Sequence, residues 1–178
     1  MASPGARVSK WWPAIGTLVF VLVVPGTVVG LVPFLLSGWT LAPPFFGWSW
    51  FRGLGVGLIA GALPIFLDFV TRFVREGRGT PAPIAPTRHL VVGGSFRYVR
   101  DPGYVAVVSL LVGQGLLFGT PAILLYAGGV ALAFHLFVVR YEEPTLRRQF
   151  GASYDVYCRA VPRWLPRRPP RRKSATPG

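Results

Sequence analysis

A carboxylate and an aromatic ring, those of Glu142 and Tyr104, are the side chains in this sequence best suited to hold a positively charged ligand. A carboxylate favours a cation such as an ammonium, and a tyrosine ring can stack on a base or make a cation–π contact. For a group transfer that needs little acid–base machinery, positioning alone can lower the barrier by about 7–11 kcal/mol. The predicted chemistry is therefore charge placement in a dry pocket, and no catalytic triad is apparent.

Two ionisable residues near Glu142 are the candidates for contact with the acceptor of such a reaction. His135 lies in an apolar block, seven residues before Glu142 and thus on nearly the same face of a helix. An ionisable group inside a membrane segment is a functional candidate. It could act as a base toward the acceptor, or simply hydrogen-bond Gln114 in the neighbouring apolar block. Arg140 could pair with an anionic acceptor group, or be an arginine that snorkels to the membrane surface.

These residues lie in or beside two polar segments, residues 89–104 and 140–166, each of which adjoins a long apolar block. We predict that the two segments close over one site at the surface of a bilayer. Composition supports a membrane protein, since 52% of the 178 residues are hydrophobic, 14% are charged and the mean hydropathy is +0.48. The lone cysteine, Cys158, excludes an intrachain disulfide, and no cluster of His and Cys suggests a metal.

The apolar blocks predict an all-α integral membrane protein with four transmembrane helices, over residues 14–36, 51–74, 103–118 and 121–139. The last two spans are predicted to form a helical hairpin. Its reversal is marked by a glycine, a threonine suited to cap the next helix and a proline suited to its first position, Gly119, Thr120 and Pro121.

Glycines at a spacing of four occur in the second predicted span, at Gly53, Gly57 and Gly61. This spacing places them on one helical face, which predicts the close approach of another helix, within the chain or from a second copy.

A C-terminal amphipathic helix on the membrane surface is predicted after Glu143, because apolar residues recur there at spacings of three and four. A break is expected near Gly151. The chain then divides into two N-terminal spans (1–78), a catalytic region (79–166) and a disordered basic tail (167–178).

The basic residues are unevenly distributed, which predicts the orientation. The chain carries 19 Lys and Arg against 6 Asp and Glu, and of the basic residues only Arg52 falls on the side away from the two polar segments. Positive residues favour the cytoplasmic side, so both termini and both polar segments are predicted to be cytoplasmic, in the plasma (inner) membrane. Their position beside apolar blocks favours anionic lipid as partner over nucleic acid.

Motifs in the two polar segments give a more specific indication. The first holds His-Leu-Val at 89–91, Gly-x-Phe at 94–96 and Arg-x-Pro-x-Tyr at 100–104. The second holds Glu-Glu at 142–143, Phe-Gly at 150–151 followed by two tyrosines, and Val-Pro-Arg at 161–163 running into Leu-Pro. In order and spacing this pattern resembles the isoprenylcysteine carboxyl methyltransferase and phospholipid methyltransferase family of membrane enzymes, over about residues 79–166.

The resemblance implies binding of S-adenosylmethionine at the cytosolic surface and a lipophilic methyl acceptor that enters from the bilayer. Methyl transfer from its sulfonium is an in-line displacement that needs little acid–base machinery. The candidate catalytic residues, His135 and Arg140, follow from their residue types and positions. The cofactor-binding residues that the resemblance implies are His89, Leu90, Val91, Phe96, Asp101, Pro102, Gly103, Tyr104 and Glu142. Three of these depart from the usual pattern: Asp101, where the family mostly has His or Asn, Phe96, where Tyr is frequent, and Gly103, which replaces a bulkier residue and could widen the pocket.

The acceptor stays open between a carboxylate, methylated on oxygen, and an amine, methylated on nitrogen. Two other functions fit parts of the sequence. A membrane reductase of the sterol-reductase type would use a nicotinamide cofactor and would need a cluster of residues matching its 2′-phosphate. A non-catalytic lipid-binding membrane protein would depend on the basic tail and would bind no cofactor.

Overall fold

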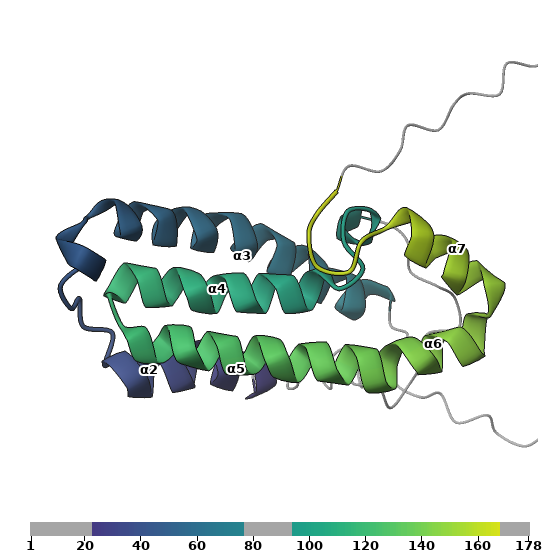
Figure 1. Ribbon diagram of the computed structural model, residues 1–178, viewed down its shortest axis with the longest axis horizontal. Coiled ribbons are helices and arrows are strands. Elements are labelled where there is room, and N and C mark those ends of the chain that lie inside the picture. The colour runs from purple at the N-terminus through teal and green to yellow at the C-terminus, as the bar shows by residue number, and fades with distance from the viewer. Residues whose placement is uncertain (1–22, 77–93, 168–178) are drawn as a thin grey trace, which may run out of the picture.

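The computed structural model of this protein describes residues 23–76 and 94–167, and the regular structure in both ranges is entirely helical (Figure 1). The start of the first predicted span, the connector at 77–93 and the tail from residue 168 lie outside the described residues. With η marking 3-10 and π-helical turns, the elements are η1 (Gly26–Leu31), α2 (Val32–Ser37), η2 (Phe45–Gly47), α3 (Trp50–Glu76), η3 (Gly94–Arg97), α4 (Pro102–Phe118), α5 (Pro121–Phe137), η4 (Val138–Glu142), α6 (Glu143–Phe150) and α7 (Ala152–Ala160).

Two helical runs among the described residues are long and apolar enough to cross a membrane. One is Trp50–Thr71 within α3, and the other is Pro121–Phe150, in which α5, η4 and α6 follow one another without a break. The other two apolar helices, Val23–Ser37 and Pro102–Phe118, are shorter. At about 1.5 Å per residue, the second of these is about 26 Å long, against a hydrocarbon core of about 30 Å.

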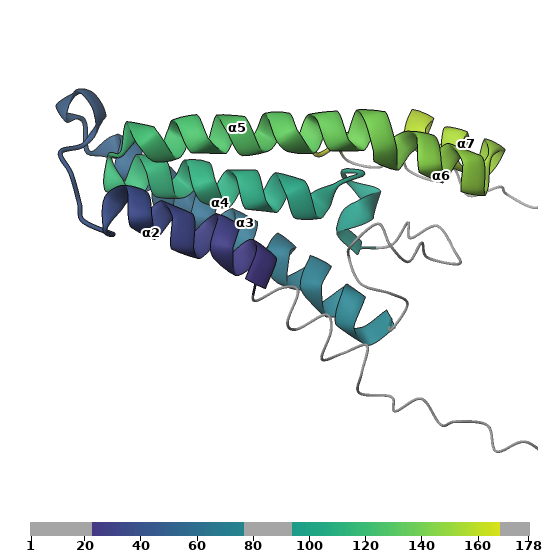
Figure 2. The ribbon, with the colours of Figure 1, turned by 90° about the horizontal axis from the view of Figure 1, so that it is seen from below.

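The helix α4 is the centre of the bundle. It lies between α3 and α5, and α2 packs beside α4 and α5 (Figures 1 and 2). The core of the bundle includes Leu111 on α4 and Ile123 on α5, both with no exposed surface. The side-chain amide of Gln114 donates to the backbone oxygen of Val29 at 2.9 Å, which connects α4 to η1. Among the described hydrogen bonds Gln114 therefore has Val29, and not His135, as its partner.

Close packing of α3 on α4 depends on Gly55 and Gly113. A Cβ at Gly55 would come within 2.6 Å of the Gly113 carbonyl oxygen, and one at Gly113 would come within 2.8 Å of Ile59. The predicted glycine face is elsewhere on the helix: Cβ atoms at Gly53, Gly57 and Gly61 would meet nothing within 4 Å. The expectation that this face receives a helix of the same chain is therefore wrong for the described residues, and the contact uses a glycine outside the four-residue spacing.

The predicted helical hairpin of α4 and α5 is confirmed. Gly119 ends α4 with φ 69°, and Thr120 takes the N-cap position before Pro121, although its side chain makes no capping hydrogen bond. A side chain at Gly119 would clash with the backbone oxygen of Pro43, so the turn requires glycine both for its positive φ and for space.

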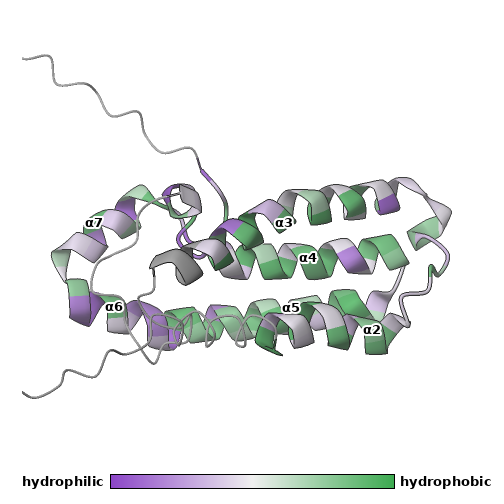
Figure 3. Ribbon diagram, turned by 180° about the vertical axis from the view of Figure 1, so that it is seen from behind, coloured by the Kyte–Doolittle hydropathy of each residue, from purple (hydrophilic) through white to green (hydrophobic). Residues whose placement is uncertain are grey.

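The C-terminal part of the chain turns back on itself after α6. Gly151, with φ 53° and ψ −131°, breaks the helix at the predicted place, and α7 then folds back toward the start of α4 (Figure 1). The predicted surface helix differs in one respect, because Tyr154 and Val161 of its apolar stripe are buried against protein. Polar residues gather mainly at this end of the molecule, whereas α2 to α5 are largely apolar (Figure 3).

Candidate active site

Three parts of the chain meet at the polar end of the bundle: the start of α4, the junction of η4 and α6, and residues 161–167, here termed the C-terminal segment (Figure 1). Proline determines where α4 begins. Pro102 occupies its first turn, where no backbone N–H is needed, and the preceding Asp101 has the non-helical angles φ −121° and ψ 64°. Asp101 therefore lies at the N-terminus of α4, one turn before Tyr104.

Tyr104 and Glu142, the pair singled out first from the sequence, are in contact. The Tyr104 hydroxyl donates to Glu142 Oε2 at 3.2 Å, although the residues lie 38 positions apart. The Tyr104 ring also packs on Phe134 of α5, with ring centroids 4.5 Å apart and planes at 31°. Both partners of the hydrogen bond are partly buried, so a carboxylate and an aromatic ring are held together in a largely enclosed place.

Glu142 and Glu143 are neighbours in sequence but face different groups. Glu142 ends the π-helical turn η4, and Glu143 begins α6. Successive residues of a helix point about 100° apart, so Glu142 faces Tyr104 while Glu143 faces Arg100 and Arg163. A π-helical turn inside an α-helix is frequently found at functional sites.

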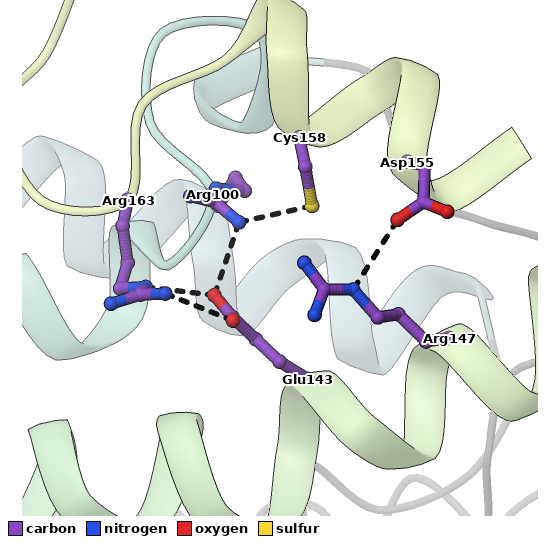
Figure 4. Close-up of polar contacts among 6 residues, drawn as sticks. All are labelled: Arg100, Glu143, Arg147, Asp155, Cys158 and Arg163. Atoms are coloured by element: carbon purple, nitrogen blue, oxygen red, sulfur yellow. Dashed lines mark hydrogen bonds and ion pairs between the residues drawn. The ribbon is translucent and has the colours of Figure 1, made fainter. Parts of the chain in front are cut away.

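Glu143 is the centre of a buried ion cluster. Arg163 binds it with two parallel hydrogen bonds, Nε to Oε1 at 2.7 Å and Nη2 to Oε2 at 2.9 Å (Figure 4). Arg100 Nη1 donates to the same Oε1 at 3.0 Å and lies 3.0 Å from the sulfur of Cys158. Glu143 is 6% exposed. Its charge is thus neutralised by two guanidinium groups within the protein.

Backbone hydrogen bonds hold the C-terminal segment against the residues before α4. Arg100 N donates to Pro162 O at 3.0 Å, and Arg167 N donates to Tyr98 O at 2.9 Å. On α7, the Tyr157 hydroxyl donates to the backbone oxygen of Phe96 at 2.8 Å. These contacts and the ion cluster fix the positions of the residues that precede Asp101. They agree with the prediction that the two polar segments lie against each other.

The carboxyl group of Asp101 is in an unusual electrostatic environment. Burial, and next the nearby Glu142 carboxylate, raise its pKa from the usual 3.8 to about 7, while Arg100 acts in the opposite direction. Its side chain makes no capping hydrogen bond to α4. Asp101 can therefore change its protonation state near neutral pH.

The other residues of the predicted cofactor set have varied surroundings. His89, Leu90 and Val91 lie outside the described residues. Phe96 belongs to η3 and offers its backbone oxygen to Tyr157, while Pro102 and Gly103 are buried in the first turn of α4. A Cβ at Gly103 would come within 2.9 Å of the Phe69 ring. A side chain here would require the Phe69 ring of α3 to shift, so the space that glycine frees is filled by Phe69.

The two predicted catalytic residues lie on the α5–η4 run. His135 is exposed on α5, with its ring 6.1 Å from that of Trp164, and Arg140 is exposed on η4. Neither forms a hydrogen bond or ion pair with Tyr104 or Glu142 among the described residues. The expected common face of His135 and Glu142 assumes an uninterrupted period of 3.6 residues, and the wider turn η4 lies between the two residues. The catalytic role of His135 and Arg140 stays a prediction.

Sequence reasoning missed the role of Arg163. In the sequence Arg163 stands out only as part of the Val-Pro-Arg motif, and its partner Glu143, 20 positions away, cannot be inferred from spacing. The sequence did hold a signal for the ion pair of Glu143. Two adjacent acids follow an apolar block, and an acid that is buried there requires a counter-charge.

The arrangement suits a cationic ligand that carries an aromatic base. Asp101 and Glu142 supply two partly buried carboxylates that no guanidinium group of the described residues pairs with, and the Tyr104 ring supplies a stacking surface. S-adenosylmethionine, with a sulfonium, an ammonium and an adenine, fits these groups. No cluster of three metal-binding side chains is found among the described residues.

A family-wide sequence model described as phospholipid methyltransferase matches residues 50–153, which is more than half of the chain. The matched region runs from the first residue of α3 into α7 and includes Asp101, Tyr104, Glu142 and Glu143. Comparison with curated proteins and with solved structures gave no match. The chain belongs to the phospholipid methyltransferase family, and it is a membrane enzyme that uses S-adenosylmethionine to methylate a lipid-type acceptor.

Proposed function

We propose that S-adenosylmethionine binds at the polar end of the bundle, between the start of α4 and the turn η4, with Glu142 and Tyr104 as its main contacts. The observation that carries this proposal is the hydrogen bond from Tyr104 to Glu142, which joins the two motif-bearing segments at one partly buried place. The division of the chain into N-terminal spans (1–78), catalytic region (79–166) and basic tail (167–178) belongs to the same proposal.

The bound cofactor supplies an electrophilic methyl group on a positively charged sulfur. Glu142 faces this charge, and because it is partly buried its attraction for a cation is stronger than it would be in water. Tyr104 fixes the Glu142 carboxylate and offers its ring to the adenine. Phe134, which packs on the Tyr104 ring, helps to keep water from the site. The remaining contacts come from residues 89–91, Phe96 and the first turn of α4.

The acceptor approaches from the bilayer along α5. His135 and Arg140 are exposed on the α5–η4 run, and Trp164 of the C-terminal segment lies beside His135. We assign these residues to the acceptor route, where Arg140 meets the lipid phosphate and His135 the headgroup. Neither residue contacts Glu142, so their contribution is to hold the acceptor and not the cofactor.

The membrane arrangement that supports this route has four spans, with both termini and the active site on the cytoplasmic side of the plasma (inner) membrane. Two of the four are the long apolar helices already described, and the central α4 runs alongside both of them (Figure 1). At the opposite end of the bundle, the loop between α2 and α3 exposes the aromatic rings of Trp39, Phe46 and Trp48, as expected at a membrane interface.

Family membership supports the methyltransferase over the two other functions considered from the sequence, the nicotinamide-dependent reductase and the non-catalytic lipid-binding protein. Both carboxyl and amine acceptors are compatible with the family resemblance, and the choice between them depends on the charges at the site.

The test is binding of S-adenosylmethionine to the detergent-solubilised full chain by isothermal titration calorimetry. Wild type should bind at micromolar concentration, and Glu142→Gln should weaken binding by about tenfold or more, since a charged contact is worth about 1.5–3 kcal/mol. Tyr104→Phe keeps the ring and loses one neutral hydrogen bond, so roughly a threefold to tenfold loss is expected.

The matched control is Asp155→Asn, which removes an acid that is half exposed on α7 and should leave binding unchanged. Binding of S-adenosylmethionine by Glu142→Gln at the wild-type affinity, or no binding by the folded wild type, would refute the proposal.

A further inference from the structure

We propose that Asp68 of α3 is a positioning residue for cofactor binding. Through the hydroxyl of Ser95 it fixes η3, and with η3 the residues 94–104, here termed the motif segment, that lead into the start of α4. The inference rests on the cofactor site proposed above. Asp68 lies outside the two polar segments, on a helix that supplies none of the cofactor contacts proposed there.

Asp68 is an acid within a helix that is otherwise apolar. The run Trp50–Thr71, which is long enough to cross a membrane, contains one other charged residue, Arg52, near its opposite end. A charged side chain in such a helix is costly, and it therefore faces a polar partner inside the protein or a functional site. Asp68 lies toward the polar end of the bundle, where the motif segment begins.

A hydroxyl of η3 binds the Asp68 carboxylate. Ser95 Oγ donates to Asp68 Oδ2 at 2.5 Å, in a partly buried place and across 27 positions of the sequence. A hydrogen bond to a carboxylate is charge-assisted and is roughly twice as strong as one between neutral groups. Ser95 is the middle residue of the Gly-x-Phe motif, so this contact joins α3 to the residue directly before Phe96.

The turn η3 depends on such contacts for its position. It is a single 3-10 turn of four residues, and its hydrogen-bond geometry is poorer than that of an α-helix. The backbone oxygen of Phe96 accepts from Tyr157 of α7, and the Ser95 hydroxyl donates to α3. Within the described ranges, the Ser95–Asp68 contact is the one hydrogen bond that joins η3 to a long apolar helix. Asp68 thus fixes where η3 lies relative to the bundle.

The residue that follows Asp68 contacts the other end of the motif segment. A Cβ at Gly103 would come within 2.9 Å of the Phe69 ring, so this ring lies against the first turn of α4. Two consecutive residues of α3 therefore contact the motif segment on both sides of Asp101, at Ser95 and at Gly103.

Loss of the Ser95–Asp68 hydrogen bond would leave η3 attached to α7 but able to move away from α3. The apparent affinity for the cofactor then falls by the fraction of molecules in which the motif segment is in place. The bundle itself is held by the close packing of α3 on α4 at Gly55 and Gly113, which this loss does not touch. Cofactor affinity should therefore change much more than the melting temperature.

The experiment measures binding of S-adenosylmethionine to the detergent-solubilised full chain by isothermal titration calorimetry, in Asp68→Ala, Ser95→Ala and the double variant. Each single variant should raise Kd by about tenfold, since a hydrogen bond to a charged group can change the fraction in place by this factor. Because both substitutions remove the same contact, the double variant should bind within about twofold of either single variant. Asp68→Asn keeps an acceptor oxygen for the hydroxyl and should recover part of the affinity.

The matched control is Thr71→Ala. The Thr71 hydroxyl donates to the backbone oxygen of Asp68 at 3.0 Å, so its removal affects the same turn of α3 without touching η3, and binding should match wild type. Hydrogen exchange gives a second measurement. The amides of Tyr98 and Val99, which donate to the backbone oxygen of Ser95, should exchange faster in Asp68→Ala and return to the wild-type rate when the cofactor saturates the site.

The contrary results are distinct. Wild-type affinity in folded Ser95→Ala overturns the inference, even if Asp68→Ala fails to fold. Losses that add up in the double variant show that Asp68 acts by a route other than Ser95, and an equal loss in Thr71→Ala assigns the effect to α3 alone; both overturn it. The proposed cofactor site survives these results as long as Glu142→Gln weakens binding. Absence of binding by folded wild type refutes the proposed function, and this inference with it.

Discussion

Arg163 and Glu143 form a bidentate ion pair, with Nε–Oε1 at 2.7 Å and Nη2–Oε2 at 2.9 Å. The pair joins the C-terminal segment to the start of α6, and Arg100 adds a third hydrogen bond to the same carboxylate from the residues before α4. Since Glu143 is almost completely buried, one carboxylate holds together three segments that are far apart in the sequence. The C-terminal segment is thereby held in a fixed position beside the residues before α4.

Removal of one arginine from this cluster should destabilise the protein. Arg163→Ala leaves a buried carboxylate with only Arg100 as counter-charge, so we expect a loss of about 2–4 kcal/mol, at the lower end for a broken buried pair because Arg163 is partly exposed. Unfolding in detergent, followed by circular dichroism, measures this loss.

Arg147→Ala is the matched control for that prediction. Its partner Asp155 is 3.3 Å away and both side chains are more than half exposed, so the expected loss is at most about 1 kcal/mol. Equal losses in the two variants would show that the cluster at Glu143 does not hold the segments together.

Substitution of Gly55 should disturb the packing of α3 on α4. A Cβ at this position would come within 2.6 Å of the Gly113 oxygen and 2.8 Å of the Leu117 nitrogen, both backbone atoms that cannot move aside cheaply. Gly55→Ala should therefore cost about 1–3 kcal/mol, as overpacking usually does. Gly57→Ala, where the new methyl meets nothing within 4 Å, should be neutral or stabilising by up to about 1 kcal/mol. Melting temperatures in the same detergent compare the two, and a lower value for Gly57→Ala than for Gly55→Ala would contradict the packing.

The stability of the ligand-free protein should fall as pH rises from about 4 to about 7 because of Asp101. Its pKa is 3.8 in the usual environment and about 7 in the fold, so the folded state binds the proton more tightly than the unfolded state does. This contribution is complete below the unfolded pKa and is lost as pH rises through the folded pKa. The difference in melting temperature between wild type and Asp101→Asn, measured from pH 4 to 8, isolates it. A difference that stays constant over this range would show that Asp101 does not titrate there.

Loss of the Tyr157 hydroxyl should loosen α7 from η3. The hydroxyl donates to the backbone oxygen of Phe96 at 2.8 Å in a partly buried place, so Tyr157→Phe should cost about 0.5–1.5 kcal/mol. Tyr141→Phe, whose side chain is exposed, should cost nothing measurable. Hydrogen exchange of the η3 backbone should rise in the first variant alone; protection that stays at the wild-type level would assign Tyr157 to packing only.

The sequence was sufficient for those features that depend on local chemistry. Hydropathy located the apolar helices, Pro102 and Gly119 marked the ends of α4, and motif order brought Tyr104 and Glu142 to one place. Features that depend on contacts between distant residues could not be predicted from the sequence. The glycine spacing indicated a face of α3 on which no described helix packs, because what decides the packing within the chain is the position of Gly113 on the other helix.

The position of His135 relative to Glu142 depends on a feature of another kind, the backbone geometry between them. Helical periodicity assumes a regular backbone, and no residue type in residues 138–142 announces a π-helical turn. Likewise, the absence of a side chain at Gly103 suggested extra room, whereas Phe69 from α3 occupies that space.

The π-helical turn η4 fixes the rotational position of Glu142 and Glu143 relative to helix α5, so the number of residues in this stretch matters as well as their identity. Deletion of one residue there would rotate everything that follows by about 100°. Glu142 would turn away from Tyr104, and Glu143 would turn away from its arginines, although all of these residues would still be present in the sequence. We therefore expect related sequences that carry all the motifs but are one residue longer or shorter in this stretch to be inactive or structurally rearranged. Substitutions of the exposed Val139 or Tyr141 should be tolerated.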